Sequence, residues 1–320
     1  MAKTKYICTY FDYNFLSRGL ALYNSIKRFH EDFVFFVLAF DEKTFEYLSK
    51  LKYDNLIPIS VTDYNNYFNT NPDKYDDRKQ YYFSATPNIC IYLFKQFPDI
   101  DSLLYLDADV YIFSSLNPLY DEVENASIAY CPHRTHPMFN KLAKNHGKYN
   151  VGVNFFKNTE IAKTCLLDWK SDCENWYKGM PGYHLQYFSD QIFLDKWENK
   201  YSGINIIQNI GVNAAPWNAV NYIFSENNGD FYVNDKPLVI YHFSSVKKIS
   251  NKKWNCNTIY YFASIKNTLR KIYKIYIEEI ESYGISNDKI EIIKLNGGFG
   301  KKIFYFFMRI FLNENVNLKK

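Results

Sequence analysis

The sequence predicts an α/β protein whose mixed, mostly parallel sheet is flanked by helices and followed by a helical C-terminal extension. Short apolar runs alternate with helical patterns near the N-terminus, which predicts parallel strands joined by right-handed crossovers. Several of these runs end in Asp or His, and open α/β sheets bind ligands at the carboxyl ends of their strands. The chain has 320 residues, 47% hydrophobic and 22% charged, which is enough for one large core plus an appendage.

The expected elements follow in chain order. Short apolar runs predict strands, and apolar residues at helical spacing predict helices. The polar stretch 63–78 is expected to be a surface loop. The strands are expected at 5–9, 33–40, 56–61, 103–106, 127–130, 149–156, 204–208 and 238–241. The helices are expected at 18–26, 44–51, 82–97, 161–176, 191–197 and 258–283.

The apolar run from Leu103 to Leu106 ends in two carboxylates, Asp107 and Asp109, and apolar residues resume at Val110. Such a run predicts a strand buried on both faces. An unpaired buried carboxylate is very costly, so this pair needs a polar partner. Side chains two apart in extended chain point the same way. Two oxygen ligands side by side at a strand end therefore suit a divalent cation.

Two other interpretations of this acidic pair stay open. The two carboxylates can simply cap a turn. They can also form a phosphatase site whose first Asp is the nucleophile, but such sites usually carry Thr or Val where this chain has Tyr111.

The segment Tyr105–Val110 resembles the DxD segment of nucleotide-sugar glycosyltransferases of the GT-A fold. It is most similar to the glycogenin-like family-8 group and to bacterial lipooligosaccharide galactosyltransferases. The resemblance continues through ordered short motifs from Lys5 to Lys248. It implies a GT-A domain over residues 1–250, with residues 251–320 as a basic, aromatic, helical extension.

The resemblance also implies which residues hold the nucleotide sugar. The first loop lacks a GxGxxG dinucleotide fingerprint, and in this family it cradles base and ribose. Asp12 in that loop can equally cap the following helix. Family members often carry an Arg on the helix that leads into the DxD strand, but residues 83–87 offer none, and Arg78 and Lys79 are the expected substitutes. The implied cofactor-binding residues are Thr9, Tyr10, Asp12, Asp107, Ala108, Asp109 and Lys248.

The segment 238–248 resembles the family's closing HxxGxxK-like motif, in which His completes the metal site and Lys meets the diphosphate. Ser245 replaces the usual Gly, and Lys247 stays open as a neighbour of Lys248. Mixed carboxylate and imidazole ligands favour Mn²⁺, with Mg²⁺ as the second choice. The implied metal ligands are Asp107, Asp109 and His242.

Two further motifs imply the sugar-binding end. The segment 149–156 resembles a NAGVLL-like strand, whose Asn holds sugar hydroxyls and whose Gly admits substrate to the backbone; a core strand with a bulge is the alternative. The segment 189–195 resembles an xDQxxLN helix start, which implies Asp190 and Gln191 as catalytic residues, with Gln191 by the β-face of the anomeric carbon. A plain helix cap is the alternative. The implied sugar-binding residues of the strand are Asn150, Gly152 and Asn154.

Two loops carry candidate substrate-binding residues by their chemistry. His133 and Arg134 follow an expected strand and can face the acceptor or the diphosphate. Alternatively, His133 and His136 bind a metal, or this is an ordered surface loop. Trp217 and Asn218 lie in a Pro-containing loop and are expected to wall the substrate pocket, with a core anchor as the alternative.

Charge is uneven along the chain. Residues 241–320 hold 15 Lys/Arg and 6 Asp/Glu, whereas the remainder holds 23 and 28, so the basic excess lies at the end. This asymmetry suggests an anionic partner for that end. The basic, aromatic segment 301–312 is too short to span a bilayer and is expected either at an anionic membrane surface or docked on protein. We expect neither a signal peptide nor a spanning helix, and the six Cys without CxxC pairs predict reduced thiols.

We therefore predict a metal-dependent glycosyltransferase that moves a sugar from a nucleotide sugar, with UDP expected, to a glycan or lipid-linked acceptor, with retention, in bacterial surface-polysaccharide synthesis. It is expected in the cytoplasm, with peripheral membrane contact and oligomerisation left open and no nucleic-acid partner. One alternative is a non-catalytic glycan-binding or scaffolding protein with the same fold. The other is a sugar-phosphate nucleotidylyltransferase, which needs a Gly-rich N-terminal loop that this chain lacks.

Overall fold

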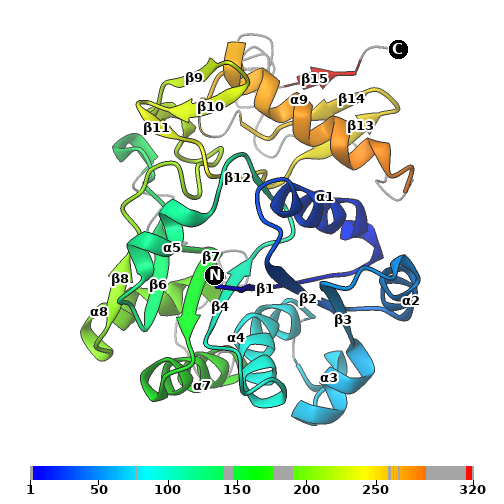
Figure 1. Ribbon diagram of the computed structural model, residues 1–320, viewed down its shortest axis with the longest axis vertical. Coiled ribbons are helices and arrows are strands. Elements are labelled where there is room, and N and C mark those ends of the chain that lie inside the picture. Colours follow the sequence, from blue (N-terminus) through cyan, green and yellow to red (C-terminus); the bar gives the residue numbers. More distant parts are fainter. Residues whose placement is uncertain are drawn as a thin grey trace, which may run out of the picture.

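The computed structural model is shown in Figure 1. It describes residues 3–75, 78–139, 147–175, 190–258, 261, 263–265, 267–285 and 315–318. The predictions for Ser189 and for the segment 301–312 lie outside the described residues.

A seven-stranded sheet in the order β3-β2-β1-β4-β7-β6-β8 forms the centre of the molecule. Within this sheet β7 pairs antiparallel with both of its neighbours, and all other pairings are parallel. The prediction of a mixed, mostly parallel sheet is therefore confirmed. The strands are β1 (Lys5–Phe11), β2 (Phe33–Ala39), β3 (Leu56–Ser60), β4 (Ser102–Leu106), β6 (Ile128–Pro132), β7 (Tyr149–Lys157) and β8 (Ile204–Ile206).

Helices cover both faces of this sheet (Figure 1). Alternate residues of β4 reach opposite cores: Leu104 packs with the first helix layer, and Leu103 packs with the second. Two-sided burial explains why this strand is apolar throughout. The first layer holds α1 (Leu16–Lys27), α2 (Glu42–Leu51) and α5 (Asn117–Val123). The second holds α3 (Val61–Phe68), α4 (Arg78–Gln96), α7 (Glu160–Asn175) and α8 (Trp197–Lys200).

The loop predicted over residues 63–78 is wrong, because α3 occupies its first part and α4 begins at its end. Ser60 caps α3 by accepting a hydrogen bond from Asp63 N at 3.0 Å. The apolar face of this helix consists of Tyr64 and Phe68, which pack in the second core. Most other positions of α3 are polar, so the sequence pattern concealed a helix that tertiary packing stabilises.

Smaller sheets and a long helix lie beside the main sheet (Figure 1). These smaller sheets and the long helix, α9, enclose a third hydrophobic core, which is built from residues such as Tyr111, Phe243 and Tyr276. The predicted helix 258–283 exists as α9 but starts later, and the division at residue 250 stays a prediction. The elements are β5 (Val110–Ile112), β9 (Phe224–Asn227), β10 (Asp230–Val233), β11 (Lys236–Pro237), β12 (Ile240–His242), β13 (Lys247–Ser250), β14 (Lys253–Asn255), α9 (Asn267–Ser282) and β15 (Asn315–Asn317).

Among the described helices, none combines the length and the apolar character needed to cross a membrane. The six cysteines are buried thiols outside any disulfide, and reduced thiols were predicted.

Candidate functional site

A tight turn holds the acidic pair at the end of β4. β4 ends at Leu106, Val110 N donates to Asp107 O at 3.2 Å, and β5 begins at Val110. The expectation that the two carboxylates converge through extended chain is therefore wrong, because a turn, rather than a strand, carries them. Neighbouring segments fix this turn: Asp107 N donates to Gly152 O at 3.1 Å, and Phe243 N donates to Asp109 O at 2.8 Å.

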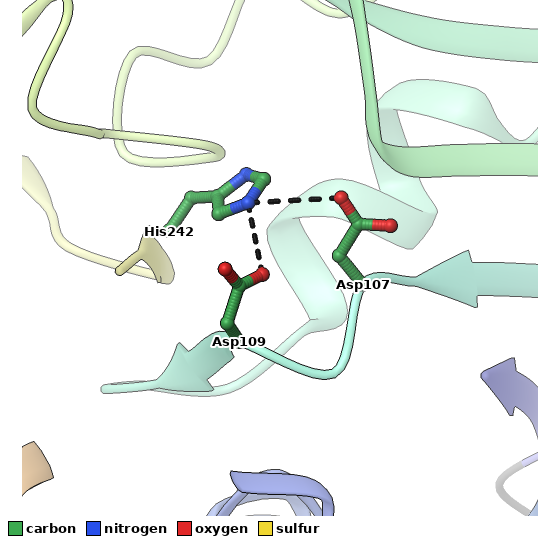
Figure 2. Close-up of side chains that lie close together, drawn as sticks. All are labelled: Asp107, Asp109 and His242. Carbon is green, nitrogen blue, oxygen red and sulfur yellow. Dashed lines mark ion pairs between the residues drawn. The ribbon is translucent and has the colours of Figure 1, made fainter. Parts of the chain in front are cut away.

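β12 delivers the third member of the site. It pairs antiparallel with β5 in a register that sets His242 opposite Val110, next to Asp109. Nε2 of His242 lies 3.0 Å from Asp109 Oδ1 and 3.6 Å from Asp107 Oδ2 (Figure 2). The predicted convergence of the two carboxylates with a histidine far along the chain is confirmed. We call Asp107, Asp109 and His242 the acidic–imidazole cluster.

The three residues influence each other's protonation. Burial raises the pKa of Asp107, with the His242 charge opposing and the Asp109 charge adding to that rise. Burial acts in the same direction on Asp109, but His242 and the Arg18 guanidinium outweigh it and hold the pKa of Asp109 below its usual value. Burial disfavours the His242 cation, yet the two carboxylates raise the pKa of His242 above its usual value. The two carboxylates that favour the charged form of His242 would also stabilise a metal cation at this place.

The cluster fits a divalent cation by its donor set. One ligand atom from each of the three residues lies within 4.8 Å of the others, the one such group found among the described residues. Two carboxylates and one imidazole suit Mn²⁺ or Mg²⁺ and leave positions for substrate oxygens. The alternative pair His133 and His136 is not part of such a group: the first contacts Gly147 O at 3.1 Å, and the second accepts from Met138 N at 3.2 Å.

Close packing holds the His242 ring in place. A Cβ on Gly152 would lie 2.5 Å from two atoms of this ring, so the glycine leaves the space that the imidazole fills. The ring of Trp217 packs edge-on against His242 with centroids 5.0 Å apart. The sequence predicted that Gly152 lets the substrate approach the backbone. In the structure the group that approaches Gly152 is the imidazole of His242.

An aromatic cavity of about 260 Å³ adjoins the acidic turn. Asp12, Asp107, Ala108 and Asp109 supply its polar and backbone part. Asp12 also caps the turn before α1, accepting from Asn14 N at 3.0 Å and Phe15 N at 3.2 Å, so its predicted capping role is confirmed. The aromatic lining residues are Tyr10, Phe11, Phe15, Phe40, Tyr82 and Tyr105. Of the two other predicted base-contacting residues, Tyr10 lines the cavity, and Thr9 is fully buried in β1.

The two predicted catalytic residues lie near this cavity. Asp190 accepts from Thr86 Oγ1 at 3.4 Å, and that hydroxyl is 3.1 Å from Tyr10 OH. Gln191 Oε1 accepts from Asn150 Nδ2 at 3.2 Å. Both residues are buried and begin a 3-10 helix over Asp190–Lys196, where an α-helix was predicted. Asn154, on the same strand as Asn150, is fully buried, and its Nδ2 donates to Val151 O at 2.9 Å.

The candidate loops have clear structural contacts. Arg134 donates hydrogen bonds to the backbone carbonyls of Val212, Ile207 and Asn209 at 2.7 to 3.2 Å. These bonds hold the segment after β8 in place. Asn218 is buried and donates to His133 O at 3.1 Å. Their predicted substrate contacts stay predictions.

Two basic side chains, Lys248 and Arg18, have different partners. Lys248 pairs with Glu281 of α9 at 2.7 Å, and its contact with diphosphate stays a prediction. The sequence reasoning missed Arg18, which is 7% exposed, donates to Val246 O at 3.2 Å and acts electrostatically on Asp109. It also missed the fully buried Asn213, whose Oδ1 lies 3.2 Å from His242 Nδ1. No sequence pattern marked either residue, because the burial of a charged or polar side chain is not visible in the sequence.

The chain is similar to known proteins over most of its length. The family model described as "Glycosyl transferase family 8" matches residues 7–282. The uncharacterized protein YfnD of Bacillus subtilis (strain 168) is 24% identical over 264 residues, covering 82% of this chain and 85% of YfnD. The uncharacterized protein YfnF of the same organism is 27% identical over 256 residues, covering 77% of this chain and 83% of YfnF.

Solved structures show the same fold. The galactosyltransferase LgtC, solved in complex with donor and acceptor sugar analogs, has a TM-score of 0.53 at 17% identity, covering 87% of this chain and 95% of LgtC. GlyE from Streptococcus pneumoniae TIGR4 has a TM-score of 0.51 at 15% identity, covering 90% of this chain and 65% of GlyE. The fold is therefore of GT-A type, as predicted.

Proposed function

Because the chain belongs to glycosyl transferase family 8 and is a nucleotide-sugar glycosyltransferase, we propose that its acidic–imidazole cluster makes it a metal-dependent enzyme that uses a UDP-sugar. The observation that carries this proposal is the convergence of Asp107, Asp109 and His242, of which the two carboxylates also line an aromatic cavity. Mn²⁺ is the expected ion, with Mg²⁺ as the second choice.

The cluster would hold a cation that neutralises the charge developing on the diphosphate leaving group. Asp107 and Asp109 supply oxygen ligands from one turn, and His242 supplies a nitrogen from β12. His242 and, after it, Arg18 lower the pKa of Asp109 against the effect of burial, which favours the ionised form that a cation needs. We propose that Lys248 breaks its ion pair with Glu281 when the donor binds and pairs with the diphosphate instead.

The aromatic cavity suits the nucleobase of the donor. Its rings offer faces and edges against which a base can stack. Asp12 lies in its wall and is proposed to accept a hydrogen bond from the ribose, with Thr9 and Tyr10 at the base. A volume of about 260 Å³ fits a nucleoside better than a whole nucleotide sugar, so the sugar would lie beyond the acidic turn.

The sugar would be oriented by the buried polar residues on the other side of the cluster. Asp190 and Gln191 begin one segment, and Asn150 links to Gln191 directly. The glycosyl centre becomes oxocarbenium-like in the transition state. We propose retention by attack on the face from which the phosphate departs, with Gln191 positioning the sugar and Asp190 contacting donor or acceptor. His133, Arg134, Trp217 and Asn218 are proposed for the acceptor side.

We further propose a glycan or lipid-linked acceptor in bacterial surface-polysaccharide synthesis, at the cytoplasmic face of the membrane. The basic excess of residues 241–320 supports contact with an anionic surface. The relatives from Bacillus subtilis support a bacterial setting.

The test is UDP release from a panel of UDP-sugars with Mn²⁺. We expect release with at least one donor, its loss on chelation, and a loss of about 10³-fold in Asp109→Asn, because several kcal/mol of charge stabilisation disappear. Asp230→Asn, which changes an exposed carboxylate on β10, is the matched control and should match wild type. Asp109→Asn releasing UDP as fast as wild type would refute the metal-dependent proposal.

A further inference from the structure

The second ring nitrogen of His242 points away from the two carboxylates (Figure 2). This nitrogen, Nδ1, lies 3.2 Å from Oδ1 of Asn213. The backbone places Asn213 there, because Ala214 forms a bridge with Tyr241 and accepts a hydrogen bond from His242 N at 2.7 Å. Asn213 has a φ of 63°, in the left-handed region that Asn tolerates better than most residues. Its side chain is fully buried, so its polar atoms have only protein partners to choose from.

Asn213 belongs to a line of buried amides. Its Nδ2 donates to Asn150 Oδ1 at 2.9 Å, and Gly152 N donates to the same oxygen at 3.0 Å. On its other side, Asn150 Nδ2 donates to Gln191 Oε1 at 3.2 Å. The line therefore joins the acidic–imidazole cluster to the predicted catalytic Gln191.

The orientation of each amide follows from one fixed donor. The oxygen and nitrogen of an amide are told apart by their partners. A backbone N–H only donates, so the Asn150 atom that faces Gly152 N is its oxygen. That oxygen needs donors, so Asn213 turns its NH₂ group toward it. The remaining atom of the Asn213 amide, its oxygen, must then face His242 Nδ1.

An amide oxygen only accepts, so Nδ1 of His242 carries the hydrogen. In the neutral ring, Nε2 is then the bare nitrogen, and it is the one that lies between Asp107 and Asp109. The opposite tautomer would turn an N–H bond toward the cation and leave the Asn213 oxygen without its donor.

We propose that Asn213 is a positioning residue that holds His242 in the Nδ1–H tautomer and so presents Nε2 as a metal ligand. The inference rests on the proposed metal-dependent function. It gives Gly152 two roles: the missing Cβ makes room for the ring, and the backbone N–H sets the direction of the amide line. Acting through Asn150, the same N–H also fixes the amide of Gln191. The oxygen of Gln191 faces Asn150 Nδ2, and its NH₂ group is directed toward other partners.

The first test reads the tautomer in the metal-free protein. Histidine labelled with ¹⁵N is observed by NMR at alkaline pH, where the ring is neutral, and the His242 signals are identified by their loss in His242→Gln. Because Asp109 lies 3.0 Å from Nε2 and competes for the ring hydrogen, the readout is a comparison: we expect a larger share of the Nδ1–H tautomer in the wild type than in Asn213→Gly. An equal share in the two proteins would overturn the inference whatever the fate of the proposed function.

The second test measures Mn²⁺ affinity by electron paramagnetic resonance, without any sugar. Asn213→Gly removes the amide at a φ that glycine adopts easily, and we expect affinity to fall about 10- to 100-fold. Asn213→Asp keeps an acceptor for Nδ1–H and should stay within a few-fold of wild type. Asn234→Gly is the matched control: its φ is 53°, and it loses one side-chain hydrogen bond, from Ile223 N at 2.9 Å, in a different sheet.

The outcomes separate the two proposals. Wild-type protein that binds Mn²⁺ no better than Asp109→Asn would overturn the metal-dependent function. Wild-type protein that binds Mn²⁺ well, with Asn213→Gly binding equally well, would overturn the role of Asn213 alone. A fall in Asn213→Gly that Asn213→Asp does not share, together with a smaller share of the Nδ1–H tautomer in Asn213→Gly, supports the role, because lost packing alone would not move the ring hydrogen.

Discussion

The two sides of the site are held together in different ways. The acidic–imidazole cluster is assembled from β4, β12 and the chain before β12 by directional hydrogen bonds and ion pairs. The aromatic cavity is walled by rings from β1, β4 and α4 and from the residues just before α1 and just after β2, and these rings meet largely by packing, as in the edge-on pair Phe40–Tyr82 at 4.9 Å. Directional polar contacts fail when one atom moves, whereas aromatic packing can readjust.

This difference predicts which kinetic constant each side controls. Cluster residues would act on the leaving group, so changes there should lower kcat and Mn²⁺ affinity. Cavity residues would hold the nucleobase, so changes there should raise KM for the donor and spare kcat. Three predictions probe the contrast, beginning with the largest expected effect.

Two glycines offer a matched pair, one on each side. In Gly152→Ala the new Cβ lies 2.5 Å from the His242 ring and must displace it, so we expect kcat to fall about 100-fold and Mn²⁺ affinity to fall with it. In Gly19→Ala the new Cβ meets the ring of Phe11, which lines the cavity. Here we expect a higher donor KM, an almost unchanged kcat and a stability loss of about 1–3 kcal/mol from overpacking.

Steady-state kinetics and Mn²⁺ titration of both variants make the comparison. Equal losses of kcat in the two variants would show that the two sides are not separate. Urea unfolding of both variants controls for general destabilisation.

Tyr82 tests the cavity directly. It is 37% exposed at the wall, and Tyr82→Ala removes a stacking surface worth about 1–3 kcal/mol per base. We expect donor KM to rise about tenfold, with Tyr82→Phe close to wild type because the ring remains. Competition by UDP should weaken in parallel, whereas a fall in kcat at unchanged KM would contradict the assignment of this cavity to the base.

Two buried imidazoles extend the contrast to pH. His242 has a raised pKa, so its contribution to stability is present at low pH and is lost as pH rises through that pKa. His30 is the opposite: burial and nearby Lys5 lower the pKa of His30 to about 4, and its Nε2 accepts from Leu116 N at 2.9 Å, which only the unprotonated nitrogen can do. Between about pH 6.5 and 4, His30 is protonated in the unfolded chain but not in the folded chain. The free energy of unfolding therefore falls as the pH falls.

The expected size of the His30 effect is up to about 3 kcal/mol. His30→Gln removes the titration and should show a smaller loss of unfolding free energy between pH 7 and pH 4.5 in urea titrations. Its donor KM and kcat at pH 7 should match wild type, because this site lies outside both sides of the cleft. An equal pH slope in variant and wild type would contradict the prediction.

Sequence reasoning succeeded where a residue carried its own local signal. The apolar strand that ends in Asp107 and Asp109 stood out because a buried charge needs a reason, and His242 followed a similar strand. It failed for α3, whose apolar face is aromatic and sparse, and for the acidic pair's backbone, where the turn was mistaken for extended chain. Asn213 and Arg18 gave no signal, because an Asn in a loop and an Arg in a helix are ordinary in sequence.

By itself, the sequence determined the fold class, the carboxylates at the end of β4 and the order of the motifs, because these follow from local hydrophobic pattern and from resemblance to a family. Only the tertiary structure decided which atoms meet. The pairing of β12 with β5 sets His242 beside Asp109, and the bridge at Ala214 brings Asn213 behind the ring. Strand register joins residues more than a hundred positions apart, and its hydrogen-bond geometry is not written in any single segment of the chain.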